Sequence, residues 1–142
     1  IKYFSDESFF AINPDTIWNS FYLKEIELLE NNFFKDKKIK CMLLLADKQK
    51  SFDKFLKGNF NLENNLIKKN NEKDLKYIFT GLQIIKPEIF LNLKADVFPM
   101  NDIWDDLIKK NELYGSKSNL DFLHVTSFKI YKKLFEKKLI IK

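Results

Sequence analysis

A nearly unbroken apolar run, IKCMLLLA at residues 39–46, is the sequence feature that most constrains the fold of this chain. A strand with one solvated face alternates apolar and polar side chains, whereas a strand covered on both faces is apolar throughout. The run therefore predicts a central strand with other secondary structure packed on each side. Such a strand is typical of a layered α/β domain.

Strand and helix signals alternate along the rest of the chain. Apolar alternation and β-branched residues predict strands at 9–13 and 75–86, a hairpin at 60–69 around Glu63-Asn64-Asn65, and two short strands around a turn at 112–125. Helical spacing of apolar residues predicts helices at 18–32, 87–93, 101–111 and 127–139. The intervening segments 47–60 and 70–74 are predicted to be a loop and a turn.

These elements predict a single domain over residues 1–142, with a mixed, mostly parallel sheet flanked by helices in a Rossmann-like arrangement. Proline 87 suits the first turn of its short helix, and Asn101 is the expected N-cap of the helix that follows. Hydrophobic residues make up 45% of the chain, which is ample for a packed core.

The composition also bounds where the chain works. Cys41 is the single cysteine and lies in the central apolar run, so we expect a buried thiol and no internal disulfide. No apolar run approaches the roughly 20 residues that span a bilayer. The acidic start of the chain is unlike a signal peptide. We therefore expect a cytoplasmic protein that has no membrane as a partner.

The net charge of +5 does not by itself indicate a nucleic-acid partner. Every one of the 25 basic residues is lysine, although arginine is the side chain that favours bidentate contact with phosphates and bases. Abundant Lys, Asn, Ile and Phe with scarce Ala, Gly and Pro are typical of an AT-rich coding sequence. We interpret the charge as a solvated, lysine-rich surface and expect no nucleic acid.

An acidic residue follows the first predicted strand, in the stretch FFAINPDTIW at 9–18. Ligands of open α/β sheets bind beyond the carboxyl ends of strands, so Asp15 is a candidate for holding a hard cation such as Mg²⁺. The alternative is a turn or N-cap residue, since Pro and Asp are both common there. The only histidine, His124, also follows a short apolar stretch. His124 is either a ligand or a structural residue. Asp6 and Asp121 are further acidic candidates near strand ends.

Gly81 interrupts the long strand predicted at 75–86. A glycine weakens a strand unless a ligand approaches the backbone or a bulge is needed, so Thr80 and Gly81 either face a ligand or form a bulge. With three glycines in the chain, a glycine-rich loop for a triphosphate is not possible. Cys and His do not occur at metal-site spacing either.

Five motifs in order resemble those of the sugar-1-phosphate nucleotidyltransferase family, in the branch of mannose-1-phosphate guanylyltransferases and N-acetylmuramate-1-phosphate uridylyltransferases. The resemblance extends over nearly the whole chain. The motifs are AINPDTIW (11–18), GNF (58–60), YIFTGLQIIKPEIF (77–90), FPMNDIWDDLI (98–108) and FLHVTSFKI (122–130).

The resemblance implies transfer of a nucleotidyl group from a nucleoside triphosphate to a sugar 1-phosphate, which yields a nucleotide sugar and pyrophosphate. It implies Mg²⁺ held by Asp15 and His124, and a sugar against Asn13, Thr80 and Gly81. The lysine that neutralises the sugar phosphate has no clear counterpart, and Lys57 is the residue we consider for it.

Three departures from the family pattern qualify this implication. The family's GTP step is Thr126-Ser127-Phe128 here, its second metal-binding aspartate is His124, and its N-terminal glycine-rich loop has no counterpart in the 142 residues. The resemblance therefore implies the C-terminal part of such an enzyme, with an apolar face around Phe9, Phe10 and Leu43 for the missing half to cover. The alternative is a non-catalytic α/β domain that binds a sugar phosphate or a protein partner.

Overall fold

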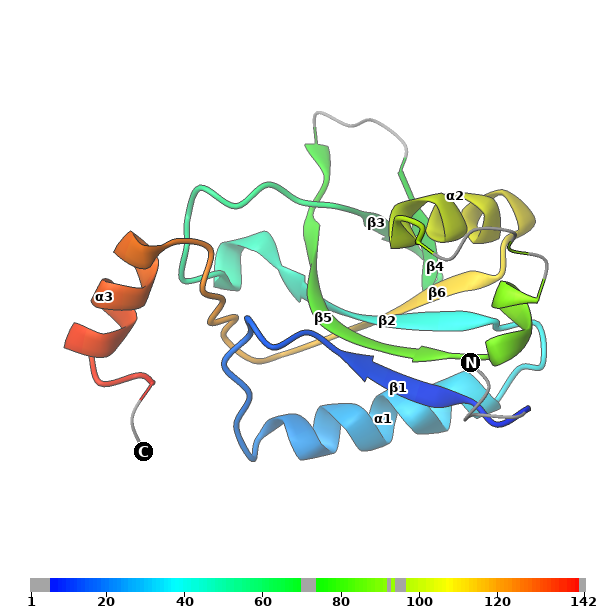
Figure 1. The fold of residues 1–142 in the computed structure, drawn as a ribbon, viewed down its shortest axis with the longest axis horizontal. Helices are drawn as coiled ribbons and strands as arrows, with labels where there is room; N and C mark the ends of the chain where they lie inside the picture. The colour runs from blue at the N-terminus through cyan, green and yellow to red at the C-terminus, as the bar shows by residue number, and fades with distance from the viewer. Residues whose placement is uncertain (1–5, 70–73, 92, 94–96, 141–142) are drawn as a thin grey trace.

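One sheet of six strands runs through the centre of the described chain, in the spatial order β1-β5-β2-β6-β4-β3 (Figure 1). The computed structural model describes residues 6–69, 74–91, 93 and 97–140, so the turn predicted at 70–74 lies largely outside the described residues. The strands are β1 (Phe9–Ile12), β2 (Cys41–Asp47), β3 (Asn61–Glu63), β4 (Leu66–Lys68), β5 (Tyr77–Ile85) and β6 (Leu113–Lys117). The helices are α1 (Tyr22–Phe34), α2 (Met100–Lys110) and α3 (Phe128–Glu136), with short 3₁₀ turns η1 (Lys48–Lys50) and η3 (Pro87–Phe90).

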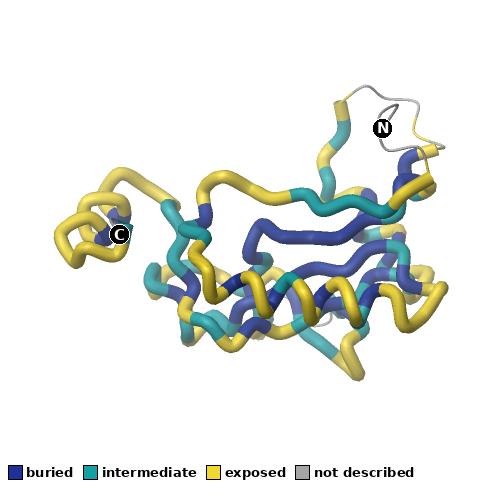
Figure 2. The backbone as a smooth tube through the Cα atoms, turned by 90° about the horizontal axis from the view of Figure 1, so that it is seen from below, coloured by how far each residue is buried: buried dark blue, intermediate teal, exposed yellow. Residues whose placement is uncertain are grey.

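Strand β2 is covered on both faces, as its apolar sequence predicts. Leu43 and Leu45 lie in the cluster that includes Trp104 and Leu107 of α2. Met42 and Leu44 lie in the opposite cluster, which includes residues of α1. The dark strands between exposed outer segments in Figure 2 show this layering. Helices on both faces of a mixed sheet confirm the predicted α/β class.

The sheet is mostly antiparallel, so the prediction of mostly parallel pairing is wrong. The β2–β6 pair is parallel, while β1–β5, β2–β5, β3–β4 and β4–β6 are antiparallel. The reason is the position of β5. Strands β1 and β2 are joined through α1 and run in the same direction, but β5 lies between them and runs the opposite way. One inserted strand thus replaces a parallel neighbour pair by two antiparallel pairs.

Three predicted boundaries are also corrected. Helix α1 begins at Tyr22 and not at residue 18, because Thr16 pairs with His124 and residues 19–21 form a turn. The residue before α2 is Pro99, so Asn101 lies within the helix. The second short strand expected in 112–125 is reduced to isolated bridges.

The expected apolar face around Phe9, Phe10 and Leu43 is not present as predicted. Leu43 is fully buried beneath α2, and the two phenylalanines are half-buried. Ile12, at the end of β1, is 52% exposed, and further large exposed apolar side chains include residues of α1 and α3. Among the described residues, no helix has the length and apolar character needed to cross a bilayer.

A bulge in β5 accounts for Thr80 and Gly81. Leu43 and Leu45 of β2, two residues apart, face Gln83 and Phe79 of β5, which are four apart. Gly81 takes φ of +92° in this bulge, a left-handed value that favours glycine. A Cβ there would lie 2.7 Å from the Cβ of Asn13. The bulge and the close approach of Asn13 therefore account for this glycine, and its contact with a sugar stays a prediction.

The side chain of Thr80 is a structural part of the sheet, and the predicted contact of this residue with a sugar stays a prediction. The residue is 1% exposed. Its hydroxyl donates to the Leu44 carbonyl oxygen (2.9 Å), and its own carbonyl accepts from the Thr16 hydroxyl (2.7 Å). The two threonines join β2, β5 and the segment after β1 through buried hydrogen bonds.

We predict that Thr80→Val lowers the free energy of unfolding by about 1–3 kcal/mol, because the Leu44 carbonyl loses its hydroxyl donor inside the sheet. Urea denaturation of the purified protein measures this loss. Thr126→Val is the matched control, since the Thr126 hydroxyl is exposed and water can replace its bond. Equal stability of the two variants would contradict the structural role of Thr80.

Candidate functional site

The segment that carries Asp15 is fixed at both ends. The Asn13 N–H donates to the Gly81 carbonyl oxygen (2.8 Å), which extends the β1–β5 ladder by one residue. The Trp18 indole N–H then donates back to the Asn13 carbonyl oxygen (2.9 Å). Between these bonds, Pro14 and Asp15 form an exposed turn, and Thr16 is buried. The turn therefore presents the Asp15 carboxylate to solvent from a rigid base.

A short backbone pairing brings His124 to Asp15. The Val125 N–H donates to the Asp15 carbonyl oxygen, and the Ile17 N–H donates to the Leu123 carbonyl oxygen, both at 2.8 Å. Thr16 and His124 face each other across this antiparallel bridge. The His124 Nε2 atom lies 3.0 Å from Oδ2 of Asp15. The structure thus brings together the two residues that the sequence singled out as candidate ligands.

The imidazole ring of His124 is held in place by its neighbours. It stacks on the buried Phe122 ring, with centroids 5.4 Å apart and planes at 13°. Its Nδ1 atom is buried, and no described residue provides a hydrogen-bond partner for it. The side chain is 23% exposed and that of Asp15 is 48% exposed. The pair therefore lies at a boundary between the protein interior and solvent.

Asp53, which sequence reasoning missed, anchors the chain just beyond His124. Its Oδ2 accepts a hydrogen bond from the Thr126 hydroxyl (2.6 Å). That bond, with a second from the Phe55 N–H, lowers the pKa of the Asp53 carboxyl. Asp53 lies in a predicted loop without a strand end or motif to mark it, so the sequence offered no signal for this contact.

A cavity of about 460 Å³ opens beside the Asp15–His124 pair. Its lining combines amide side chains, aromatic rings, one lysine and the pair itself. The lining residues are Asn13, Asp15, Gly58, Asn59, Phe60, Lys69, Leu75, Phe79, Asn101, Trp104 and His124. Such a mixture suits a ligand that has both hydroxyl groups and an apolar ring face.

The cavity has a rigid aromatic wall. The Trp104 ring makes edge-to-face contacts with Phe79 (centroids 4.9 Å apart) and with Phe60 (5.8 Å). The Trp104 indole N–H donates to Oε1 of the buried Gln83 (3.2 Å), which fixes the ring plane. The amide of Asn59 accepts a bond from the Phe79 N–H (2.9 Å). These contacts hold the wall independently of any ligand.

Lys69 is the lysine that lines this cavity, whereas Lys57 does not line it. The Lys69 Nζ forms an ion pair with Asp105 of α2 and lies 5.6 Å from the centroid of the Phe60 ring. The hairpin β3–β4 delivers Lys69 because Asn64 and Asn65 take the positive φ values that a two-residue turn requires. The predicted hairpin was a signal for Lys69 that sequence reasoning did not use.

The remaining candidates are distributed as follows. Asn13 lines the cavity with Asp15 and His124, while Thr80 and Gly81 do not. Asp121 lines a different cavity, of about 670 Å³, between the loop at 50–55 and α3. Asp6 is exposed and lines none of these cavities.

In the part of the chain that the structure describes, Asp15 and His124 are the acidic and imidazole donors that meet at this site. Among the described residues, no group of three or more His, Cys, Asp and Glu side chains could hold a metal ion. One carboxylate and one imidazole make an incomplete coordination shell. Mg²⁺ is commonly bound through one or two carboxylates with the remaining positions filled by water and substrate phosphates. The donor pair therefore fits an ion that a phosphate-bearing substrate helps to hold.

Comparison with known proteins supports the fold. No family model matches the chain, and no curated protein matches its sequence. A crystal structure of a protein assigned as a glucose-1-phosphate thymidylyltransferase from Bacillus anthracis, in complex with sucrose, is similar with a TM-score of 0.69 and 15% sequence identity. The similarity covers 99% of this chain and 58% of that protein. The chain thus has a sugar-1-phosphate nucleotidyltransferase-like fold.

Proposed function

We propose that this chain takes part in nucleotidyl transfer from a nucleoside triphosphate to a sugar 1-phosphate, and that it provides the side of the site that holds the sugar phosphate and Mg²⁺. The observation that carries the proposal is the 3.0 Å approach of Asp15 to His124 at the edge of the mixed-character cavity. The shared fold supports the same reaction class.

In this reaction an oxygen of the sugar phosphate attacks the α-phosphorus of the triphosphate. A phosphorus–oxygen bond forms on one side, and the bond to the departing pyrophosphate breaks on the other. The chemistry requires alignment and charge neutralisation more than covalent participation by the protein. The chain carries no glycine-rich loop, so the triphosphate would be held by residues outside these 142.

The residues around the cavity supply the alignment. The amides of Asn13 and Asn101 can each donate to and accept from sugar hydroxyls. The fixed Trp104 ring offers an apolar edge against which a sugar ring can lie. Lys69 would neutralise the sugar phosphate by moving its Nζ from Asp105 toward the cavity.

Mg²⁺ would be held by Asp15 and His124, and when bound it would neutralise phosphate charge during the transfer. Of the two, Asp15 is the better ligand because hard cations prefer carboxylate oxygen to imidazole nitrogen. The partly buried Asp15–His124 contact also means that an entering ion competes with His124 for the carboxylate.

A non-catalytic sugar-phosphate-binding domain is the second candidate. Two observations favour it. His124 already contacts the Asp15 carboxylate. In addition, Thr126-Ser127-Phe128 stands where the nucleotidyltransferase family has its glycine-containing step. Calorimetric binding of a sugar 1-phosphate without pyrophosphate release, across a panel of nucleoside triphosphates, would identify this function instead.

We predict that Asp15→Asn in the full-length gene product lowers turnover by about 10²–10³-fold, as is typical for loss of one preorganised electrostatic group. Pyrophosphate release with a panel of nucleoside triphosphates and sugar 1-phosphates measures the rate. Asp47→Asn is the matched control, because Asp47 ends strand β2 and bonds to the Gln49 N–H outside the cavity. His124→Ala should lower turnover less. A near wild-type rate for Asp15→Asn at saturating Mg²⁺ would rule out the proposed role.

We further predict that Lys69→Ala raises the KM for the sugar 1-phosphate by roughly tenfold or more, since a charge-assisted contact contributes about 1.5–3 kcal/mol. Lys57→Ala, a change of the same residue type outside the cavity lining, should leave that KM unchanged. Steady-state kinetics at fixed nucleotide concentration provide the measurement. An effect of Lys57→Ala that equals that of Lys69→Ala would show that net charge, and not the position of Lys69, is responsible.

A further inference from the structure

Helix α3 lies at one end of the molecule, outside the layers that cover the sheet (Figure 1). Within the helix, Ile130 and Leu134 are buried, with 8% and 0% exposure. All of its other residues are exposed. The body of the protein therefore covers a narrow strip of this helix and leaves most of its circumference in solvent.

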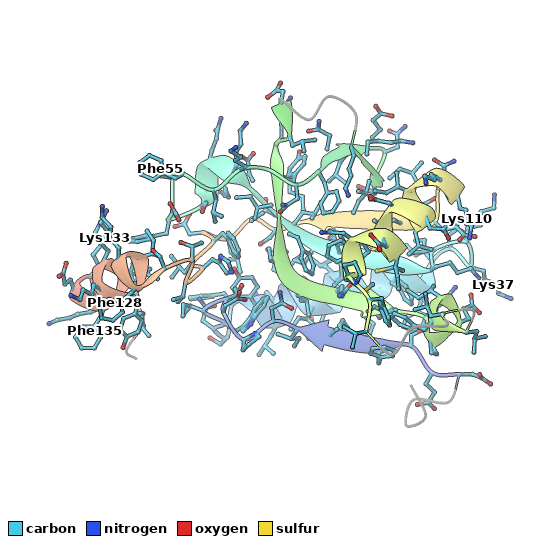
Figure 3. All side chains as sticks on the ribbon, turned by 45° about the horizontal axis from the view of Figure 1, so that its top comes forward. Lys37, Phe55, Lys110, Phe128, Lys133 and Phe135 are labelled. Atoms are coloured by element: carbon cyan, nitrogen blue, oxygen red, sulfur yellow. The ribbon has the colours of Figure 1, made fainter. Side chains whose placement is uncertain are left out.

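An aromatic stripe continues the apolar side of α3 beyond the part that the protein covers. Phe128, Tyr131 and Phe135 are spaced at i, i+3 and i+7, which places them on one side of a helix. They are 70%, 39% and 49% exposed. Their rings follow one another along the helix, with centroids 6.2 and 6.3 Å apart. Figure 3 shows Phe128 and Phe135 extending into solvent on the same side.

The rest of the exposed helix surface is strongly basic. Five lysines and a single glutamate lie between residues 128 and 138, and the lysines are Lys129, Lys132, Lys133, Lys137 and Lys138. The Nζ of Lys132 lies 4.8 Å from the centroid of the Phe128 ring, at the edge of the aromatic stripe. The aromatic and basic groups are thus adjacent on one short surface.

We propose that the exposed face of α3 binds the surface of a membrane that contains anionic lipids. Aromatic side chains on a basic amphipathic helix are the pattern of helices that lie in the interface of a bilayer. The rings would enter the headgroup region, where aromatic residues are favoured. Lysine ammonium groups beside them would meet lipid phosphates, which attract basic segments to an anionic membrane surface.

Charge decides between this occupant and the other possibilities. A second copy of α3 would bring two helices of the same high positive charge together, which repels. An acidic protein would match the charge, but the stripe projects from a protruding helix and its three aromatic residues line neither of the two cavities described above. A deformable lipid surface can surround such a projection. The proposal replaces the expectation from sequence that no membrane is a partner. That expectation rested on the lack of a bilayer-spanning run, which surface binding does not need.

The experiment compares vesicle binding of the purified chain by co-sedimentation. Vesicles of phosphatidylcholine alone are compared with an equimolar mixture of phosphatidylcholine and phosphatidylglycerol. The test variant carries Phe128→Ser and Phe135→Ser. The control variant carries Phe21→Ser and Phe55→Ser, which are 69% and 92% exposed and lie outside α3. Because all four phenylalanines are exposed, both variants should keep the fold, which circular dichroism verifies.

The wild type and the control should bind the anionic vesicles and not the neutral ones, with affinity that falls as salt is added. The α3 variant should bind roughly tenfold or more weakly, because two aromatic side chains no longer enter the interface. Equal binding of the two variants would overturn the proposal. Failure of the wild type to bind the anionic vesicles would also overturn it, and dimerisation through α3 or binding of an acidic amphipathic peptide would then identify the occupant instead. None of these vesicle-binding measurements depends on catalytic activity.

Discussion

The candidate site depends on a backbone pairing of three residues with three others. Residues 15–17 and 123–125 belong to segments more than a hundred positions apart, and two hydrogen bonds of 2.8 Å join them. Without that pairing, Asp15 would be one more exposed turn residue after a strand, and His124 would be a half-buried ring on Phe122. Their 3.0 Å contact follows from main-chain geometry, which side-chain substitution alters little.

That pairing is in turn supported by the bulge in β5. The bulge places the Thr80 carbonyl within reach of the Thr16 hydroxyl, and Gly81 makes room for the Asn13 side chain. Thr80 and Gly81, which the sequence suggested as ligand contacts, therefore act one layer behind the cavity. A glycine that interrupts a strand can be required by a neighbouring side chain of the protein as readily as by a substrate.

The sequence predicted those elements whose residues act locally. The hairpin turn at Asn64 and Asn65, the buried strand β2 and the amphipathic helix α3 follow from short-range periodicity and backbone preference, and the structure confirms them. The direction of β5 did not follow, because an apolar strand carries no signal for the orientation of its neighbours. Asp53 was missed for a related reason, because its contact with Thr126 joins a loop to a distant segment and no local pattern marks it. Lys69 was missed although the predicted hairpin marks its position, because its ion pair with Asp105 of α2 forms only after the hairpin and the helix have come together.

In the proposed function, two side-chain contacts rearrange as a substrate enters. Before entry, His124 lies against Asp15, and Asp105 pairs with Lys69. A sugar phosphate brings negative charge between these two pairs. The phosphate then competes with Asp105 for Lys69, and the added negative charge near Asp15 favours binding of a cation there. Two protein donors alone hold a divalent ion weakly, whereas phosphate oxygens complete its shell. Ion and substrate should therefore bind with positive cooperativity, a property that a purely structural Asp15–His124 pair would not show.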